Sequence, residues 1–427
     1  MIEVQPNELL CKATALSLGN WIVQQGLEGT DQETLLKGYC EQLVAFGVPL
    51  VRLHVAQRAF HPQFGGIGFD WTRADGVSHE HYEHTDQPVQ GWLQSPFYHM
   101  LESQKTQMRE RLDAPGYSSR FPLLNDLRDL GATEYFASSV LFEKDDAEVP
   151  TNPDQPPEGI LISWTSDGAN GFSDSDVALL LELLPELGLA LKSASNRQMA
   201  KDLMRVYLGR DAGARVLSGE FRRGSLRTIN ATIWYFDLSG FTHLTELTSG
   251  PVLVDMLNEY LGLAVAAVHA NGGNVLKFMG DGIMAMFGQE DTAEAGLAAL
   301  RAGVELRSGL EKMNVARLEQ DLPVTDFTLA IHAGEILYGN IGAENRLDFT
   351  VIGPAVNLTA RLAGMHKALG QRVVVSKAIF DATQGGEFDL VSLGRYMVRG
   401  VADPQTLFTI YEGAKNSPQP PEALGIS

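Results

Sequence analysis

One stretch constrains the fold of this chain more than any other: residues 274–287, Asn-Val-Leu-Lys-Phe-Met-Gly-Asp-Gly-Ile-Met-Ala-Met-Phe. Apolar residues on both sides of Gly280-Asp281-Gly282 predict two buried strands joined by a tight turn, where glycine supplies positive φ angles that other residues resist. The turn presents one carboxylate, Asp281, and the first strand carries one cation, Lys277. A charge inside an apolar strand is costly unless it has a partner. The stretch therefore predicts a β-hairpin that receives a polar or anionic ligand.

The overall composition narrows the class of protein. A length of 427 residues suggests two or three domains with substantial cores. The net charge of −20 argues against binding to nucleic acid or to an anionic membrane, because both need basic patches. Cys11 and Cys40 are too far apart for a metal motif and suggest no disulfide framework. The start has no secretory signal features, and no apolar run is suited to spanning a bilayer. We expect a cytosolic protein.

The first 172 residues predict a small α/β domain. Apolar residues recur with the helical period through most of residues 1–50, and two short helices follow. Strands are predicted at 49–55, 135–142 and 159–164, with an acidic, proline-rich loop between the last two. This order resembles that of GAF-like sensory domains. We therefore expect residues 1–172 to form an amino-terminal regulatory domain.

Histidines gather in the same part of the chain. Six of the ten lie between residues 54 and 99, among them His79, His81 and His84. Metal or haem binding is one interpretation of this cluster. A solvated polar segment is the favoured one, because the spacing fits no settled ligand motif and acidic residues surround it.

Residues 173–222 predict a connecting helix and linker. Ser173 precedes Asp174 and Asp176, a helix start with an N-cap hydroxyl and early acids. An apolar stripe runs from there towards Leu208, with a kink expected at Pro185. Such a stripe either packs on its own domain or pairs with its copy in a dimer, and the sequence leaves both readings open.

The pattern changes over residues 223–413. Helices are predicted from Pro251, Thr292 and Pro354. Strands are predicted at 231–236, in the hairpin 274–287, and at 327–333, 336–341, 348–352, 372–376, 388–398 and 407–411. The order β-α-β-β-α-β with extra strands is that of a ferredoxin-like sheet with helices on one face, so the fold class is α/β (α+β). The proline-rich residues 414–427 predict a disordered tail.

Two carboxylates stand at the ends of buried strands in this region. Asp237 follows the strand at 231–236, and Asp281 lies in the hairpin turn. Adjacent strand ends would bring both to the same ions, and carboxylate oxygens suit Mg²⁺ or Mn²⁺ with substrate phosphates as further ligands. Turn chemistry explains each aspartate better when it is taken alone. A metal site is therefore predicted only when the two aspartates are considered together.

Four sets of residues occur in order in the second half of the chain. They are Phe-Asp-Leu-Ser-Gly-Phe-Thr at 236–242, Lys-Phe-Met-Gly-Asp-Gly at 277–282, Ala-Gly-Glu at 333–335 with Gly-Asn-Ile-Gly at 339–342, and Phe-Thr-Val-Ile-Gly at 349–353 with Val-Asn-Leu-Thr-Ala-Arg-Leu at 356–362. Together they resemble the catalytic domain of the class III nucleotidyl cyclases. The resemblance covers residues 228–412, and several motifs in order make a chance match improbable.

The resemblance implies a role for each motif residue. Asp237 and Asp281, helped by the Leu238 carbonyl, would bind two Mg²⁺ or Mn²⁺ ions in each active site. Asn357 would position the ribose and Arg361 would stabilise negative charge on the transferring phosphorus; four residues apart, they share one helix face. Further substrate contacts would come from Phe241, Thr242, Arg346 and Arg399. For the two arginines an exposed loop position is an almost equally good explanation.

Two residues indicate the base of the nucleotide. By the resemblance, Lys277 would donate to adenine N1 and the Thr350 hydroxyl would accept from the exocyclic amine, which favours ATP over GTP. Thr350 differs from the aspartate most common in adenylyl cyclases and resembles a bicarbonate-responsive subgroup. Pro354 also departs from the usual acid or amide at its position. Bicarbonate, or another ligand of the amino-terminal domain, is the expected regulator.

The resemblance also implies a homodimer with two composite sites. Metal-binding residues of one chain would face the base-binding and Asn357/Arg361 residues of the other. We expect an adenylyl cyclase that forms cyclic AMP and pyrophosphate from ATP. Two alternatives stay open: a guanylyl cyclase, which Lys277 argues against, and a non-catalytic nucleotide-sensing protein, which the intact set of motif residues argues against.

Overall fold

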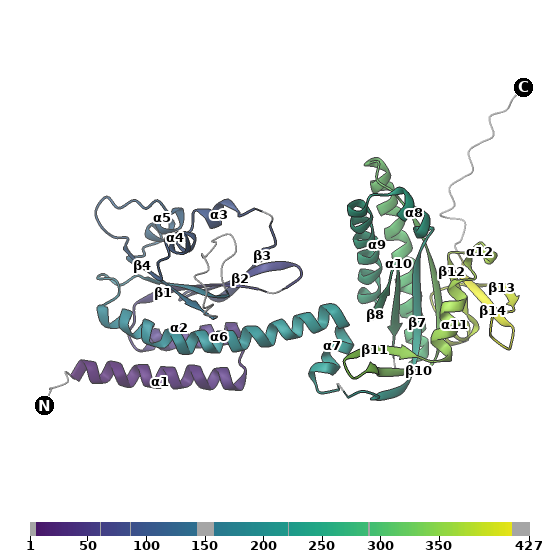
Figure 1. Ribbon diagram of the computed structural model, residues 1–427, viewed down its shortest axis with the longest axis horizontal. Coiled ribbons are helices and arrows are strands. Elements are labelled where there is room, and N and C mark those ends of the chain that lie inside the picture. The colour runs from purple at the N-terminus through teal and green to yellow at the C-terminus, as the bar shows by residue number, and fades with distance from the viewer. Residues whose placement is uncertain are drawn as a thin grey trace, which may run out of the picture. The chain divides into compact units, whose positions relative to one another are not determined.

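The computed structural model describes residues 6–59, 61–85, 87–142, 158–220, 222–288 and 291–411. The chain divides into two compact units, Met1–Leu203 and Met204–Ser427. Each unit is built around its own β-sheet with helices packed on it (Figure 1). The predicted loop at 145–157 and the predicted tail at 414–427 lie outside the described residues.

The amino-terminal unit is a six-stranded antiparallel sheet in the order β3-β2-β1-β6-β5-β4. Its strands are β1 (Leu50–Arg58), β2 (Phe64–Thr72), β3 (Gly76–Glu83), β4 (Gln107–Arg111), β5 (Glu134–Leu141) and β6 (Gly159–Ser166). Helices α1 (Pro6–Glu28), α2 (Gln32–Ala45) and the first half of α6 (Asp174–Leu208) cover one face, around Trp164. The short helices α3 (Gln90–Leu93), α4 (Pro96–Glu102) and α5 (Pro122–Asp129) belong to the other side, where α4 and α5 supply much of a second core.

The three strands predicted in this unit are present, but three others were missed. β2 and β3 form a hairpin within the region rich in aromatic residues and histidine, and β4 pairs with β5. The three glycines of β2, and the glycine and two glutamates of β3, have low strand propensity. β3 is an edge strand with exposed side chains, so it shows no apolar alternation. Within the described residues, no group of three or more metal-type side chains forms around these histidines.

The helix predicted after Ser173 is confirmed as α6. The Asp176 N–H donates to Ser173 Oγ at 3.1 Å and the Ser173 N–H donates to Asp176 Oδ2 at 2.8 Å, a reciprocal cap. The helix continues through Pro185, and one side of it is buried in its own unit, including Leu180, Leu183, Leu184, Leu187 and Leu191. It ends before Gly209, whose φ of 85° turns the chain into α7 (Arg210–Leu217). Pairing of the rest of α6 with a second copy stays a prediction.

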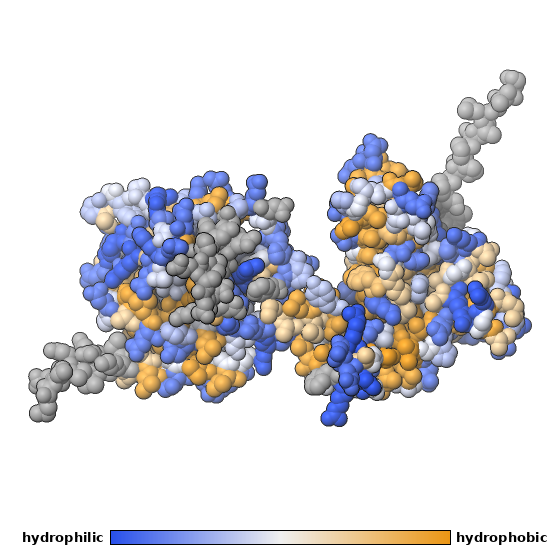
Figure 2. All heavy atoms as spheres, in the orientation of Figure 1, coloured by the Kyte–Doolittle hydropathy of each residue, from blue (hydrophilic) through white to orange (hydrophobic). Residues whose placement is uncertain are grey.

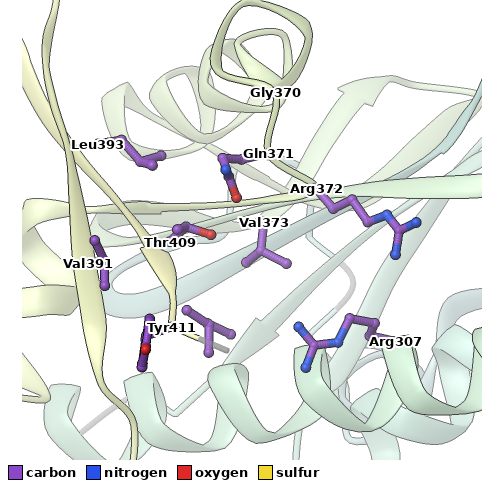
Figure 3. Close-up of a pocket in the computed structure, with 10 residues that line it drawn as sticks. Arg307, Gly370, Gln371, Arg372, Val373, Val391, Leu393, Thr409 and Tyr411 are labelled. Atoms are coloured by element: carbon purple, nitrogen blue, oxygen red, sulfur yellow. The ribbon is translucent and has the colours of Figure 1, made fainter. Parts of the chain in front are cut away.

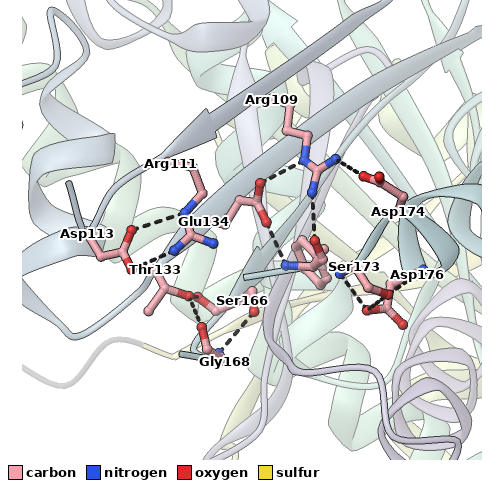
Figure 4. Close-up of polar contacts among 11 residues, drawn as sticks. Arg109, Arg111, Asp113, Thr133, Glu134, Ser166, Gly168, Ser173, Asp174 and Asp176 are labelled. Carbon is pink, nitrogen blue, oxygen red and sulfur yellow. Dashed lines mark hydrogen bonds and ion pairs between the residues drawn. The ribbon is translucent and has the colours of Figure 1, made fainter. Parts of the chain in front are cut away.

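A buried carboxylate ties strands β4 and β5 to the start of α6 (Figure 4). Glu134 is 1% exposed and accepts hydrogen bonds from Arg109 Nε at 2.7 Å and from the Phe172 N–H at 2.6 Å. The same guanidinium donates to the Phe172 carbonyl and to Asp174. The charge of Glu134 is thus matched by a cation and a backbone donor at the point where the chain leaves β6 for α6.

We expect Glu134→Ala to destabilise the amino-terminal unit by about 3 kcal/mol, because it leaves the Phe172 N–H and the Arg109 guanidinium without their buried acceptor. Urea unfolding followed by tryptophan fluorescence measures the loss. Asp113→Ala removes the exposed acceptor of Arg111 and serves as the matched control, with an expected change below about 1 kcal/mol. Equal losses for the two variants would contradict the role given to Glu134.

The carboxy-terminal unit has an eight-stranded sheet in the order β13-β14-β12-β10-β7-β9-β8, with β11 paired to β10. Its strands are β7 (Leu226–Ser239), β8 (Asn274–Met279), β9 (Gly282–Phe287), β10 (Asp326–Ala343), β11 (Arg346–Ile352), β12 (Val373–Ser376), β13 (Leu390–Tyr396) and β14 (Gln405–Ile410). Helices α9 (Gly250–Ala270) and α10 (Thr292–Glu319) connect β7 to β8 and β9 to β10. The central strands β10-β7-β9-β8 and these two helices form the predicted ferredoxin-like arrangement, which confirms the fold class.

The two faces of this sheet differ. α9 and α10 cover one face, where Trp234, Phe236 and Phe287 are buried in the main core. α7 and α11 (Pro354–Ala363) pack on the other face, together with β11. Side chains alternate along each strand, so Asp237 lies on this second face while its neighbours Phe236 and Leu238 point into the core.

The sequence predicted two strands where the structure has one, β10. Gly334 lies between the two predicted strands, but it pairs with Ala231 of β7 and continues the ladder. A Cβ at this position would lie 3.0 Å from the Ala355 Cβ of α11. The glycine therefore permits close packing of the helix on the strand and does not end the strand.

By length and composition, one helix in the described part of the chain could cross a membrane: α9. No such helix was expected from the sequence. In the structure, Met256, Tyr260 and Ala264 of α9 are buried in the core of the sheet. The outer side of α9 also carries apolar residues, and Val254 is exposed there. In Figure 2 this part of the unit shows orange, hydrophobic surface.

Candidate active site

The two predicted metal carboxylates meet on the second face of the sheet. β7 and β9 pair in a register that sets Asp237 opposite Gly282, the residue after Asp281. Burial and the nearby charge of Asp281 raise the pKa of Asp237 to about 6, while the charge of His366 opposes the shift. A divalent cation between the two carboxylates would relieve the repulsion that raises this pKa. The pair therefore fits Mg²⁺ or Mn²⁺.

The protein supplies few ligands at this point. Among the described residues, no cluster of three or more histidine, cysteine, aspartate or glutamate side chains could hold a metal ion. The Leu238 side chain is buried in the core, so only its backbone could contribute. A site with two carboxylates leaves coordination positions for substrate phosphates, as Mg²⁺ sites for nucleotides generally do.

Gly282 gives the Asp237 carboxylate its space. A Cβ built on Gly282 would lie 2.8 Å from Asp237 Oδ1 and 2.7 Å from the Phe236 carbonyl oxygen. The backbone at Gly280, with a φ of 71°, makes the turn that presents Asp281. Each of the two glycines that flank the turn thus helps to place a carboxylate: Gly280 that of Asp281, and Gly282 that of Asp237.

The two predicted base-reading residues are brought together. Lys277 of β8 donates from Nζ to Thr350 Oγ1 at 3.3 Å. Thr350 is 7% exposed and sits in β11, which pairs with β10 in a hairpin. The cation that lacked a partner in the sequence therefore has one in the structure, contributed by a strand 73 residues further along the chain.

Helix α11 carries the predicted catalytic residues. Asn357 and Arg361 are exposed on one side of it, while Ala355, Val356 and Leu362 are buried on the other. Arg361 Nη1 donates to the Gly400 carbonyl at 2.5 Å, so it lies beside the backbone of the residue after Arg399. Pro354 is the first residue of the helix, where a missing N–H costs nothing.

The remaining predicted residues surround these groups. Arg346 lies in the hairpin between β10 and β11, opposite Ala343, and is exposed. Phe241 packs against the main core at the start of α8 (Phe241–Leu247), and Thr242 is exposed beside it. In the described part of the chain, no hydrogen bond or ion pair links the carboxylates, the Lys277–Thr350 pair and the α11 residues to one another. A single chain thus presents the carboxylates, the Lys277–Thr350 pair and the α11 residues as three groups that are not bonded to one another.

Two histidines near these groups gave no signal in the sequence. His332 of β10 hydrogen-bonds through Nδ1 to Ser376 Oγ at 2.8 Å, and burial lowers its pKa to about 4, so it is uncharged at neutral pH. His366 of α12 (His366–Leu369) contributes charge near Asp237. Neither residue belongs to a motif, and their neighbours come from distant parts of the chain.

The cavity of about 470 Å³ in Figure 3 lies away from all these residues. It is lined by Arg307 of α10, by Arg372 before β12, and by residues of β13 and β14. Arg372 is paired with Asp326 at 2.6 Å. The predicted site residues occupy the opposite, open face of the sheet instead.

Residues 225–412 match the family model of the adenylate and guanylate cyclase catalytic domain. This part of the chain is therefore similar to cyclase catalytic domains. An adenylate cyclase of Anabaena cylindrica is 32% identical over 160 residues, which are 36% of this chain and 31% of that protein. Adenylate cyclase 1 of Rhizobium meliloti (strain 1021) is 31% identical over 226 residues, 51% of this chain and 34% of that protein. The chain therefore spans about a third of the length of these two relatives.

Among solved structures, the adenylyl cyclase CyaB from P. aeruginosa overlaps 45% of this chain and 100% of its own, with 24% identity and a TM-score of 0.42. The family match covers every residue that the sequence analysis assigned to the site, from Asp237 to Arg399.

Proposed function

We propose that this chain is an adenylyl cyclase that converts ATP to 3′,5′-cyclic AMP and pyrophosphate. The observation that carries the proposal is the hydrogen bond between Lys277 and Thr350 within the cyclase domain. An ammonium donor beside a hydroxyl acceptor matches adenine N1 and the exocyclic amine, whereas guanine would turn its N1–H donor towards the lysine. The two relatives named adenylate cyclases support the same substrate.

The residues of the chain would act by position and charge. Asp237 and Asp281 would hold two Mg²⁺ or Mn²⁺ ions, which when bound stabilise the charge that develops on the phosphates and the attacking oxygen. Asn357 would orient the ribose so that O3′ lies in line with the α-phosphorus, and Arg361 would neutralise the phosphoryl oxygens. The O3′–P bond forms, the bond to pyrophosphate breaks, and the 3′-hydroxyl proton passes to solvent.

A homodimer would complete the site. Each chain carries one carboxylate pair, one base-reading pair and one α11 face, with no direct bond joining them among the described residues. A second copy related by a two-fold axis would set the carboxylates of one chain against the base-reading and α11 residues of the other, twice. We therefore infer two equivalent composite sites.

Product analysis tests the proposal directly. Purified protein is incubated with Mg²⁺ or Mn²⁺ and either ATP or GTP, and the products are separated. We expect cyclic AMP and pyrophosphate from ATP. Cyclic GMP from GTP alone would replace the proposal with a guanylyl cyclase. If neither cyclic nucleotide forms while nucleotide still binds, the chain would be a nucleotide-sensing protein on a cyclase scaffold.

We also propose the arrangement around the catalytic part. Residues 1–172 would be a GAF-like regulatory domain, 173–222 a connecting helix and linker, and 223–413 the catalytic domain of a cytosolic enzyme that binds neither nucleic acid nor membrane. Thr350 suggests bicarbonate as a regulator. Cyclic AMP synthesis that ignores added bicarbonate at fixed pH would contradict that suggestion.

Gly282→Ala should lower cyclic AMP synthesis at least about tenfold, with a larger metal requirement, because the added methyl group occupies the space of the Asp237 carboxylate. Rates are measured across a Mn²⁺ titration at saturating ATP. Gly262→Ala in α9 adds the same methyl group into open space and is the matched control. Unchanged metal dependence in Gly282→Ala would mean that Asp237 does not bind the metal from this position.

A further inference from the structure

The end of β7 is anchored by a hydrogen-bonded group that no motif includes. Thr325, directly before β10, donates from Oγ1 to the Ser239 carbonyl at 2.7 Å. Ser239 is the last residue of β7 and follows Asp237 by two positions. Ser239 also pairs with Asp326 as the terminal pair of the β7–β10 ladder. Beyond it Gly240, with a φ of 71°, turns the chain into α8.

Thr325 is held in turn by α9 and α10. Its N–H donates to the Tyr260 hydroxyl at 3.2 Å, and its carbonyl accepts from Asn314 Nδ2 at 2.8 Å. The Tyr260 hydroxyl donates to Asn314 Oδ1, which closes a ring of three residues. The Tyr260 ring is fully buried and Thr325 is 7% exposed, so water does not compete for these bonds.

A buried cation supports this ring. The Arg317 guanidinium lies 5.6 Å from the centre of the Tyr260 ring and is 4% exposed. It donates to Glu259 at 2.5 Å and to the Pro323 carbonyl at 2.9 Å, so its charge is matched. Arg317 thus fixes both the tyrosine and the segment that leads into Thr325.

From this geometry we infer that Thr325 is a positioning residue for Asp237. Through the Ser239 carbonyl it fixes the end of β7 against α9 and α10, which cover the face opposite to the carboxylates. Rotation of the strand there would break the Thr325 bond, so this bond helps to hold Asp237 in its place opposite Gly282 and near the charge of Asp281. The inference rests on the proposed metal role of these two aspartates.

The hydroxyl of Thr325 is tested by an isosteric change. Thr325→Val removes the donor to Ser239 while keeping the volume, and we expect Mn²⁺ to bind about tenfold more weakly. Thr325→Ser keeps the donor and should restore affinity to within about twofold. Binding is measured on the full-length protein with Mn²⁺ alone, by the loss of the free-ion signal in electron paramagnetic resonance. This measurement needs no catalysis. Its outcome therefore stays informative about Thr325 even if the protein does not carry out the proposed cyclase reaction.

Thr383→Val is the matched control, since Thr383 is also buried and donates from Oγ1 to a backbone carbonyl, that of Ile379, away from the carboxylates. It should lose stability but keep the wild-type Mn²⁺ affinity. If Thr325→Val does not fold, Tyr260→Phe tests the same ring by removing the hydroxyl that holds Thr325. Wild-type affinity in a folded Thr325→Val or Tyr260→Phe protein, or an equal loss in Thr383→Val, would overturn the inference.

Discussion

A mixture of two inactive variants, Asp237→Ala and Asn357→Ala, should recover cyclic AMP synthesis. Each variant alone damages both composite sites of its homodimer and should lose at least about a hundredfold in rate. A heterodimer of the two contains one site in which both defects fall together and one site that is intact. Purified heterodimer should therefore show about half the activity of the wild-type protein.

The structure supplies a matched control for this experiment. Asp237 and Asp281 belong to the same pair within one chain, since the charge of Asp281 contributes to the raised pKa of Asp237. A heterodimer of Asp237→Ala with Asp281→Ala consequently has a damaged carboxylate pair in both sites and should stay inactive. Subunits with different affinity tags allow the heterodimers to be isolated before the assay. Recovery in both mixtures, or in neither, would contradict composite sites.

Exchange of the base-reading pair should move the substrate preference towards GTP. In Lys277→Glu/Thr350→Cys the ammonium donor is replaced by a carboxylate, which accepts from the N1–H and exocyclic amine of guanine and repels adenine N1. The ratio of kcat/KM for GTP to that for ATP should rise by about a hundredfold or more, because unpaired polar groups in a buried base site discriminate strongly. Initial rates with each nucleotide give the ratio.

Lys312→Glu is the control for this change in charge. Lys312 is exposed on α10, on the opposite face of the sheet from Lys277. The same reversal of charge there should leave the preference for ATP unaltered. If the double variant loses activity with both nucleotides and gains none with GTP, the Lys277–Thr350 pair would be structural, and the choice of base would lie with other residues.

The parts of the site that the sequence predicted are those carried by short continuous motifs. The hairpin at 274–287, the strand that carries Asp237 and the helix that starts at Pro354 each contain their own turn or cap residues, so local patterns were sufficient. The pairing of Lys277 with Thr350 joins two motifs and followed from the family resemblance. Its distance and the burial of Thr350 required the structure.

What could not be predicted depends on contacts between distant segments. Thr325 and Tyr260 are 65 residues apart and both are ordinary core-forming residue types, so no pattern marks their bond. β2 and β3 were missed because three glycines interrupt the apolar residues of β2, and because the exposed side chains of the edge strand β3 create no apolar alternation. β10 was divided in two because the space that Gly334 leaves for α11 is visible only once the helix is in place.

The long ladder between β7 and β10 has a consequence for how this protein can change over time. Its register runs without a shift from Leu226 opposite Gly339 to Ser239 opposite Asp326. One residue inserted or deleted before Phe236 would turn every later side chain of the strand to the other face, moving the Asp237 carboxylate into the main core and Phe236 out of it. Related sequences should therefore vary here by substitution at constant length, while gains and losses of residues collect in the connections between strands.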